Sequence, residues 1–97
     1  STATCSGWTF ETVDQNEAGM YSSLVFNSND EPYIAYYDSD NEDLKIAHHD
    51  GASWTITTVD SNGNVGQFID MAIDSNDTLH IVYYDDTLGN LKYAFGQ

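Results

Sequence analysis

Residues 36–47 read YYDSDNEDLKIA, and residues 83–94 read YYDDTLGNLKYA. Working outward, the similarity reaches back to Trp8 in the first copy and to Trp54 in the second. With one inserted residue in the second copy, 17 of the 42 positions in residues 8–49 are identical. The chain therefore contains one unit twice, with a period of 46 to 47 residues.

Each unit holds four short runs in which apolar residues alternate or cluster, and turn-forming residues separate the runs. No stretch has a helical period. A repeat of this length with four strands is typical of one blade of a β-propeller. We therefore predict an all-β chain with an irregular leader at residues 1–7 and a two-blade unit at residues 8–97, its repeats spanning about 8–49 and 54–96. The expected strands are Trp8–Val13, Tyr21–Phe26, Tyr33–Tyr37, Leu44–His49, Trp54–Val59, Phe68–Ile73, Leu79–Tyr84 and Leu91–Phe95.

The strand count predicts how the blades are completed. In a propeller the innermost strand comes first, so the first blade runs from residue 21 to residue 59. The second blade then lacks its fourth strand, while Trp8–Val13 has no blade of its own. We expect Trp8–Val13 of one subunit to complete the second blade of its neighbour, which would remove an open sheet edge. Coordinates in which Trp8–Val13 hangs free, or folds back to seal its own chain alone, would overturn this exchange and the binding centre that depends on it.

Two blades per chain allow rings of four, six or eight blades. We expect six blades, made by a homotrimer. The alternative is that the chain is a fragment of a longer propeller, because repeat architectures generally need three or more units for stability.

The charge excludes several classes of partner. Sixteen acidic residues stand against two lysines and no arginine, giving a formal net charge of −14. Nucleic acids and anionic membrane surfaces would be repelled, whereas neutral sugars, amines and cations remain open. Such charge also opposes self-assembly, so we expect salt or calcium to favour the oligomer. An acidic surface that only aids solubility is the simpler reading.

Two resemblances follow from the turns. Asp50-Gly51-Ala52-Ser53-Trp54 resembles a degenerate Asp-box, the turn of sialidase-like propellers, and the wider repeat looks like that of many bacterial propeller proteins. In organisation the chain is similar to two-blade lectins that self-assemble and bind sugars. The first resemblance implies a fold and no activity, because the arginine triad of sialidases has no counterpart here.

Five residues are candidates for ligand binding. Tyr21, Phe68 and Asp70 begin the innermost strands and differ between the copies, as residues needed only for packing would not. Asp38 and Asp85 close the repeated Tyr-Tyr-Asp motif. The tyrosines of that motif could stack on sugars, but their place in the middle of each blade favours a core role. They are Tyr36, Tyr37, Tyr83 and Tyr84.

Calcium is a possible cofactor. Asp38, Asp40 and Glu42 place oxygen ligands at alternate positions, as hard-cation loops do. A second run, residues 60–64, is similar. Neither has the spacing of an EF-hand, and such side chains also cap tight turns by bonding their own backbone.

The remaining polar residues favour structural roles. Lys45 is expected to pair with Asp38 or Asp43, and Lys92 with Asp85 or Asp86, within one blade. His48 and His49 are adjacent on a strand, point to opposite faces and cannot chelate one ion together. The role of Cys5 is left open; it cannot form a disulfide within the chain, which has no other cysteine.

We predict a non-enzymatic, lectin-like ligand-binding unit that favours neutral carbohydrate. The alternatives are a glycosidase-like enzyme without the arginine triad, which would need only two carboxylates, and a structural unit with no small ligand. The sequence does not fix the compartment, and a secreted or extracellular one is favoured.

Overall fold

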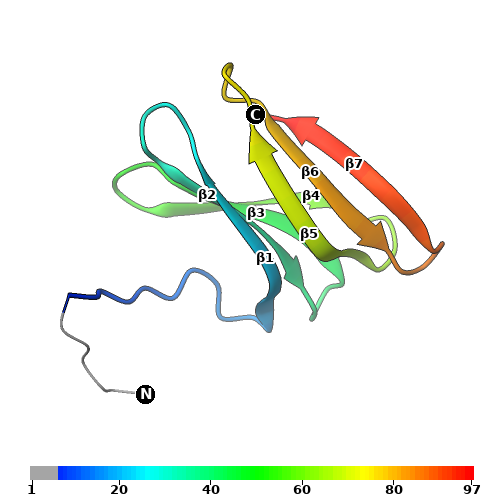
Figure 1. Ribbon diagram of the computed structural model, residues 1–97. Helices are drawn as coiled ribbons and strands as arrows, with labels where there is room; N and C mark the ends of the chain where they lie inside the picture. The colour runs from blue at the N-terminus through cyan, green and yellow to red at the C-terminus, as the bar shows by residue number, and fades with distance from the viewer. Residues whose placement is uncertain (1–6) are drawn as a thin grey trace.

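The computed structural model describes residues 7–97, which form seven β-strands (Figure 1). Within this range no helix is long and apolar enough to cross a membrane. The strands make a four-stranded sheet in the order β1-β2-β3-β4 and a three-stranded sheet in the order β5-β6-β7, with antiparallel neighbours throughout. The predicted all-β class is confirmed. Cys5, whose role was left open, lies outside the described residues. The strands are β1 (Ala18–Phe26), β2 (Pro32–Asp38), β3 (Asp43–His49), β4 (Trp54–Asp60), β5 (Val65–Ile73), β6 (Leu79–Asp85) and β7 (Asn90–Gly96).

Seven of the eight expected strands form, each slightly longer than predicted. The largest extensions are in β1 and β5, which begin three residues early. Gly19 and Gly66, at φ of 93° and 108°, let the backbone enter a bulged part of each sheet before the regular strand. Within the first sheet, the Trp54 strand lies at the outer edge, as the repeat predicts.

The prediction of a strand at Trp8–Val13 is wrong for the single chain. These residues are in no strand, and Trp8 and Phe10 are 74% and 69% exposed. A strand persists only when its backbone groups pair with a free sheet edge, and this segment pairs with none. Trp8–Val13 therefore does not seal its own chain, and it does not hang free, because Glu11 bonds the first sheet. Exchange of this segment needs a second copy, so it stays a prediction.

The two copies fold in the same register. Tyr36 lies opposite Lys45 in the first sheet, as Tyr83 lies opposite Lys92 in the second. Equivalent positions can therefore be compared directly: those before the inserted residue differ by 46, and those after it by 47.

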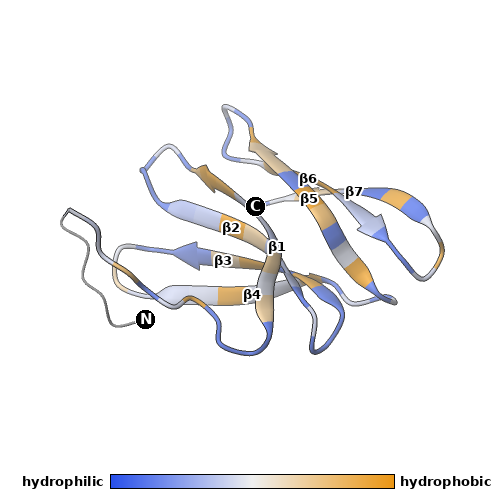
Figure 2. Ribbon diagram, turned by 60° about the horizontal axis from the view of Figure 1, so that its bottom comes forward, coloured by the Kyte–Doolittle hydropathy of each residue, from blue (hydrophilic) through white to orange (hydrophobic). Residues whose placement is uncertain are grey.

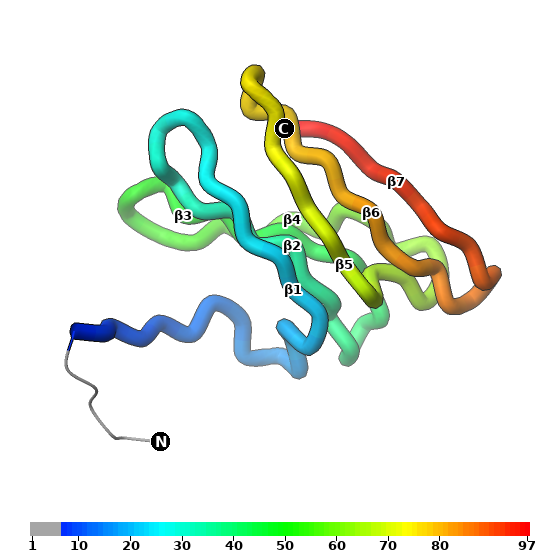
Figure 3. The backbone as a smooth tube through the Cα atoms, viewed as in Figure 1, coloured from blue at the N-terminus to red at the C-terminus, as the bar shows by residue number. Residues whose placement is uncertain are grey.

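The core lies between the two sheets, where β1 and β5 run side by side (Figure 3). Apolar residues gather in the middle of the strands, and the turns are hydrophilic (Figure 2). Tyr36, Tyr37 and Tyr83 are buried, which confirms that most of the repeated tyrosines serve the core. The buried cluster comprises Ala35, Leu44, Val65, Met71, Leu79, Ile81 and Tyr83.

Candidate functional site

The interface between the sheets includes a close contact of Leu44 with Gly66. Leu44 is fully buried, and a Cβ built on Gly66 would lie 2.9 Å from the Leu44 Cα. Only glycine fits this approach, because the backbone of β3 cannot yield as a flexible side chain could. Gly66 therefore fixes how tightly the second sheet docks on the first.

Polar contacts also cross this interface. The Tyr37 hydroxyl donates to Asn64 Oδ1 at 2.6 Å. The Ser28 backbone N donates to Asp77 Oδ1 at 2.9 Å, and the Ser28 hydroxyl donates to Asp77 Oδ2. Near the innermost strands, the backbone N of Met71 donates to Ser23 Oγ at 3.2 Å. Together with the leucine contact they make a specific, directional interface.

The second sheet exposes the face that is equivalent to the buried face of the first. Leu91 is equivalent to Leu44 but is 80% exposed, whereas Leu44 is 0% exposed. Side chains two and four residues further along β7 share this face of the strand and are also exposed. We call this surface the tail face; it consists of Val82, Leu91, Tyr93 and Phe95.

The first sheet also exposes an apolar surface. Leu24 and Phe26 are 55% and 54% exposed, while the equivalent Met71 and Ile73 pack into the core. Gly19, equivalent to Gly66, has no atom within 4 Å of the position of its Cβ. We call Gly19, Leu24 and Phe26 the head face. Each sheet thus has one side that the other sheet covers and one side that is open to solvent. The tail face is equivalent to the half of the inner interface that the first sheet supplies, and the head face is equivalent to the half that the second sheet supplies.

The segment before β1 lies against the first sheet as the end of β4 lies against the second. The Tyr36 hydroxyl donates to Asp14 Oδ2 at 2.7 Å, and the equivalent Tyr83 hydroxyl donates to Asp60 Oδ2 at 2.6 Å. The backbone bond from Ser39 N to Glu17 O is repeated between Asp86 N and Asn64 O. The indole of Trp54 donates to Glu11 Oε1 at 3.1 Å. Residues 14–17 thus repeat, against the first sheet, the contacts that residues 60–64 make with the second, and Glu11 adds a contact to β4.

Each sheet carries a lysine and a tyrosine next to carboxylates. Lys45 pairs with Asp38 at 2.9 Å, as predicted. The predicted pairing of Lys92 with Asp85 or Asp86 is wrong, since Lys92 pairs with Asp60 of the first sheet at 2.7 Å. The chain passes from β4 directly beside the second sheet, which brings Asp60 closer than the turn residues.

These pairings change the ionisation of the groups involved. Burial raises the pKa of Asp60, but the bonds from Lys92 and Tyr83 outweigh it and hold that pKa below its ordinary value. The bond from Tyr36 is the main cause of the lowered pKa of Asp14. Burial raises the pKa of Tyr83 well above its ordinary value. The groups are thus fixed as carboxylate acceptors with protonated donors, an arrangement suited to holding structure.

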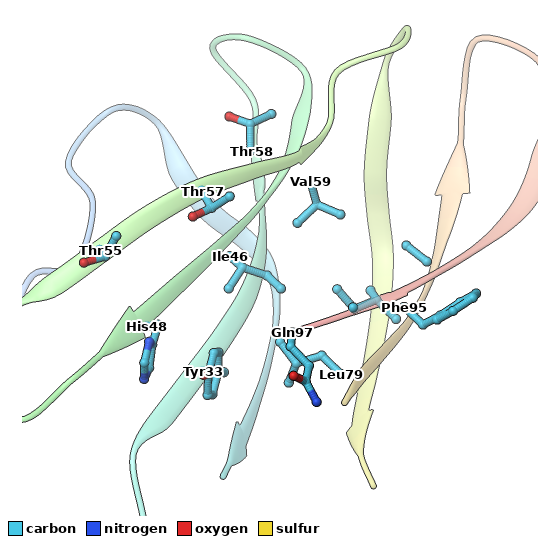
Figure 4. Close-up of a pocket in the computed structure, with 13 residues that line it drawn as sticks. Tyr33, Ile46, His48, Thr55, Thr57, Thr58, Val59, Leu79, Phe95 and Gln97 are labelled. Carbon is cyan, nitrogen blue, oxygen red and sulfur yellow. The ribbon is translucent and has the colours of Figure 1, made fainter. Parts of the chain in front are cut away.

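A cavity of about 320 Å³ opens between the outer strands of the two sheets (Figure 4). On the first sheet its wall includes Thr55 and Thr57 of β4 and His48 of β3, whose ring stacks on Tyr33 with centroids 4.1 Å apart. On the second sheet the wall includes the end of β7. Sequence reasoning missed this site, which depends on how far the two sheets diverge. The lining residues are Tyr33, Ile46, His48, Thr55, Thr57, Thr58, Val59, Leu79, Ile81, Ala94, Phe95, Gly96 and Gln97.

Two of the predicted ligand residues lie together on the innermost strands. The rings of Tyr21 and Phe68 have centroids 4.8 Å apart, and each also contacts a tyrosine of the repeated motif. Phe68 is 65% exposed, so the cluster offers one aromatic face to solvent. Asp70, two residues along β5, is exposed.

The predicted carboxylates of the Tyr-Tyr-Asp motif are buried. Asp38 accepts from Lys45 and from both nitrogens of Asn41, and Asp85 accepts from the backbone of Leu88. Both therefore stabilise the turn that follows them.

The candidate calcium residues do not converge. Asp40 and Glu42 are exposed, and the backbone N of Asp40 donates to Asp38 Oδ1 at 3.1 Å. Within residues 7–97 no group of three or more His, Cys, Asp or Glu side chains is placed to hold a metal ion.

No protein-family model matches the chain, and neither a curated protein nor a solved structure is similar to it at a significant level.

Proposed function

We propose that this chain is a ring-forming β-propeller unit whose copies associate head to tail, and that the ring binds a neutral carbohydrate without catalysis. The two sheets would be neighbouring blades, with three copies making six blades. The observation that carries the proposal is the contrast between Leu44, fully buried, and the equivalent Leu91, 80% exposed. Because the sequence repeats Leu-Lys at both places, we expect the two leucines to have the same surroundings in the assembled protein.

Transferring the inner interface to the open faces supports this assembly. Leu91 of one copy would lie on Gly19 of the next, as Leu44 lies on Gly66. Ser75 would donate to Asp30 of the next copy, as Ser28 donates to Asp77. Both of these pairs keep identical residues in the two copies.

The contacts that change between the copies stay chemically matched. The Tyr84 hydroxyl would meet Glu17 where the equivalent Tyr37 meets Asn64, and both partners are acceptors. Asp70 would accept from the backbone of Leu24 where Ser23 accepts from Met71.

The energy of this association is marginal for one pair of faces. Burying Leu91, Tyr93 and Phe95 contributes about 1.5–3 kcal/mol for each side chain. Bringing two molecules together costs about 4–15 kcal/mol. We therefore expect assembly to depend on protein concentration and on closure of the ring, in which every copy uses both faces.

The native mass tests the assembly. We expect light scattering to give about 32 kDa, three times the chain mass of 10.8 kDa. Leu91→Asp should shift the particle to the monomer, because the new charge would be buried against the next copy. Leu88→Asp is the matched control: Leu88 is 71% exposed in the β6–β7 turn, and its equivalent Asn41 is exposed too. A wild-type monomer at every protein and salt concentration would contradict the proposal.

Carbohydrate binding is supported by the exposed aromatic surface at the innermost strands. Sugar rings pack their C–H faces on aromatic rings, and nearby polar groups bond the hydroxyls. Phe68 offers such a ring, and the charge of −14 disfavours anionic ligands. We expect neutral glycans to bind on a glycan array without being turned over, and Phe68→Ala to lose the binding. Hydrolysis of the bound glycan would favour the glycosidase alternative, and no binding would favour a structural unit.

A further inference from the structure

The cavity between the two sheets lies beside the β7 edge of the second sheet, which has no neighbouring strand in the described residues. In the first sheet, β4 covers the edge of β3. The equivalent edge, on β7, leaves its backbone groups unpaired and borders the cavity through Ala94 and Gly96. An open edge of this kind is a template for a further strand.

We propose that this cavity is the seat of residues 8–14 of a second copy, which pair with β7 and insert two aromatic side chains. The inference rests on the proposed head-to-tail assembly and specifies how it closes. The occupant is a second copy because residues 8–14 are the repeat equivalent of β4, with five of the seven positions identical to residues 54–60.

The register follows from the pairing of β3 with β4. Ala47 lies opposite Ile56, and His49 lies opposite Trp54. At the equivalent positions, Phe10 of the second copy would lie opposite Ala94, and its Trp8 opposite Gly96. An aromatic side chain across from glycine covers the backbone that glycine leaves bare.

The same register decides which way the side chains point. In a strand pair, residues directly opposite each other share a face of the sheet. Because Ala94 and Gly96 face the cavity, Trp8 and Phe10 of the second copy would enter it. In the single chain these two side chains are 74% and 69% exposed, and each aromatic ring has roughly 150–250 Å² to bury.

A contact already present within the chain supports this placement. The leader touches the first sheet through Glu11, which accepts from the indole of Trp54. Glu11 is equivalent to Thr57, and Trp54 is equivalent to Trp8. The transferred contact places Trp8 of the second copy over Thr57, which lines the cavity. Two relations transferred by the repeat, the strand register and the indole contact, thus point to the same seat.

A register-specific disulfide tests the seat. In a Cys5→Ser background, Phe10→Cys and Ala94→Cys would place thiols on directly opposed residues, at a spacing that suits a disulfide. Under mild oxidation in added salt we expect covalent products between chains that end at a trimer on non-reducing gels. Thr9→Cys with Ala94→Cys is the control, because Thr9 would point to the other face and should not cross-link. Circular dichroism of each variant verifies that the β-structure is retained.

The other outcomes are distinguishable. A cross-link confined to one chain would overturn the proposal by showing that the leader seals its own edge. Oligomers by light scattering without the cross-link would overturn the seat and leave the head-to-tail assembly standing. Monomers under all conditions would overturn both. As a second measurement, a Trp54→Phe variant leaves Trp8 as the only tryptophan. We expect its emission to shift to the blue on assembly, and an unchanged emission in oligomers would contradict the seat.

Discussion

Gly66 and Gly19 are equivalent positions of the repeat, so Gly66→Ala and Gly19→Ala compare the same substitution at a packed site and at an open site. Both glycines have positive φ, 108° and 93°, so alanine strains the backbone at either place by about 1–3 kcal/mol. At Gly66 the new Cβ would also lie 2.9 Å from the Cα of Leu44. Overpacking of a core costs about 1–3 kcal/mol, so the total for Gly66→Ala is roughly 2–6 kcal/mol. At Gly19 there is nothing within 4 Å.

Urea unfolding at low protein concentration measures this difference in the monomer. We expect Gly66→Ala to lower the free energy of unfolding by about 1–3 kcal/mol more than Gly19→Ala does, since only the first meets a neighbouring backbone. Equal losses for the two variants would refute the packing role assigned to Gly66. A domain stability of roughly 5–15 kcal/mol leaves both variants measurable.

In the assembled ring the expectation for Gly19 changes. If Leu91 of a second copy occupies the place that Leu44 takes over Gly66, the Gly19→Ala methyl collides with it. The same cost of about 1–3 kcal/mol then appears as a weaker association, roughly 5- to 150-fold in the dissociation constant. Sedimentation velocity over a concentration series reads this directly. An unchanged association of Gly19→Ala would refute the head-to-tail geometry.

Three further outcomes are expected. Asp60→Asn should lower the free energy of unfolding at pH 7 by about 1.5–3 kcal/mol, because the carboxylate holds Lys92 and Tyr83. Because the folded pKa of Asp60 is lowered, its contribution to stability is complete above the unfolded pKa and is lost as pH falls through the folded pKa. Urea midpoints of the wild type and the variant at neutral and acidic pH measure this loss. A difference between the two proteins that is undiminished in acid would contradict the role of the carboxylate. Tyr37→Phe should cost about 1 kcal/mol by leaving Asn64 without its donor, which thermal unfolding against the wild type measures. Sodium chloride should raise the native mass, because three chains of charge −14 repel one another; a mass independent of salt in light scattering would exclude this role of charge.

The strands of both sheets could be predicted from the sequence because their alternation and their turns are local. Trp8–Val13 was the exception, although it matches the Trp54 strand closely. Its alternation predicts a strand wherever it pairs with an open sheet edge, and within the single chain it pairs with none. Local pattern gives the tendency of a segment, and the partner decides whether the strand forms.

The candidate site could be predicted only in part. Tyr21 and Phe68 were singled out by their difference between the copies, and they lie together. Lys92 was paired with the wrong carboxylate because the spacing along the chain does not reveal that Asp60 crosses from the preceding sheet. The cavity depends on the divergence of the sheets, a property of the whole packing.

The open faces carry the strongest argument from repetition. A chain adapted to keep its second sheet in water would gain from polar residues on the tail face. Instead, Tyr93 and Phe95 stand where the covered first sheet has Ile46 and His48, so the exposed copy is no more polar than the buried one. Leu91 is retained unchanged at 80% exposure. Apolar residues in a repeated pattern, kept where water would disfavour them, support the proposed partner, which would have the shape of the other half of the same interface. The head face is such a half, and it is carried by the same chain.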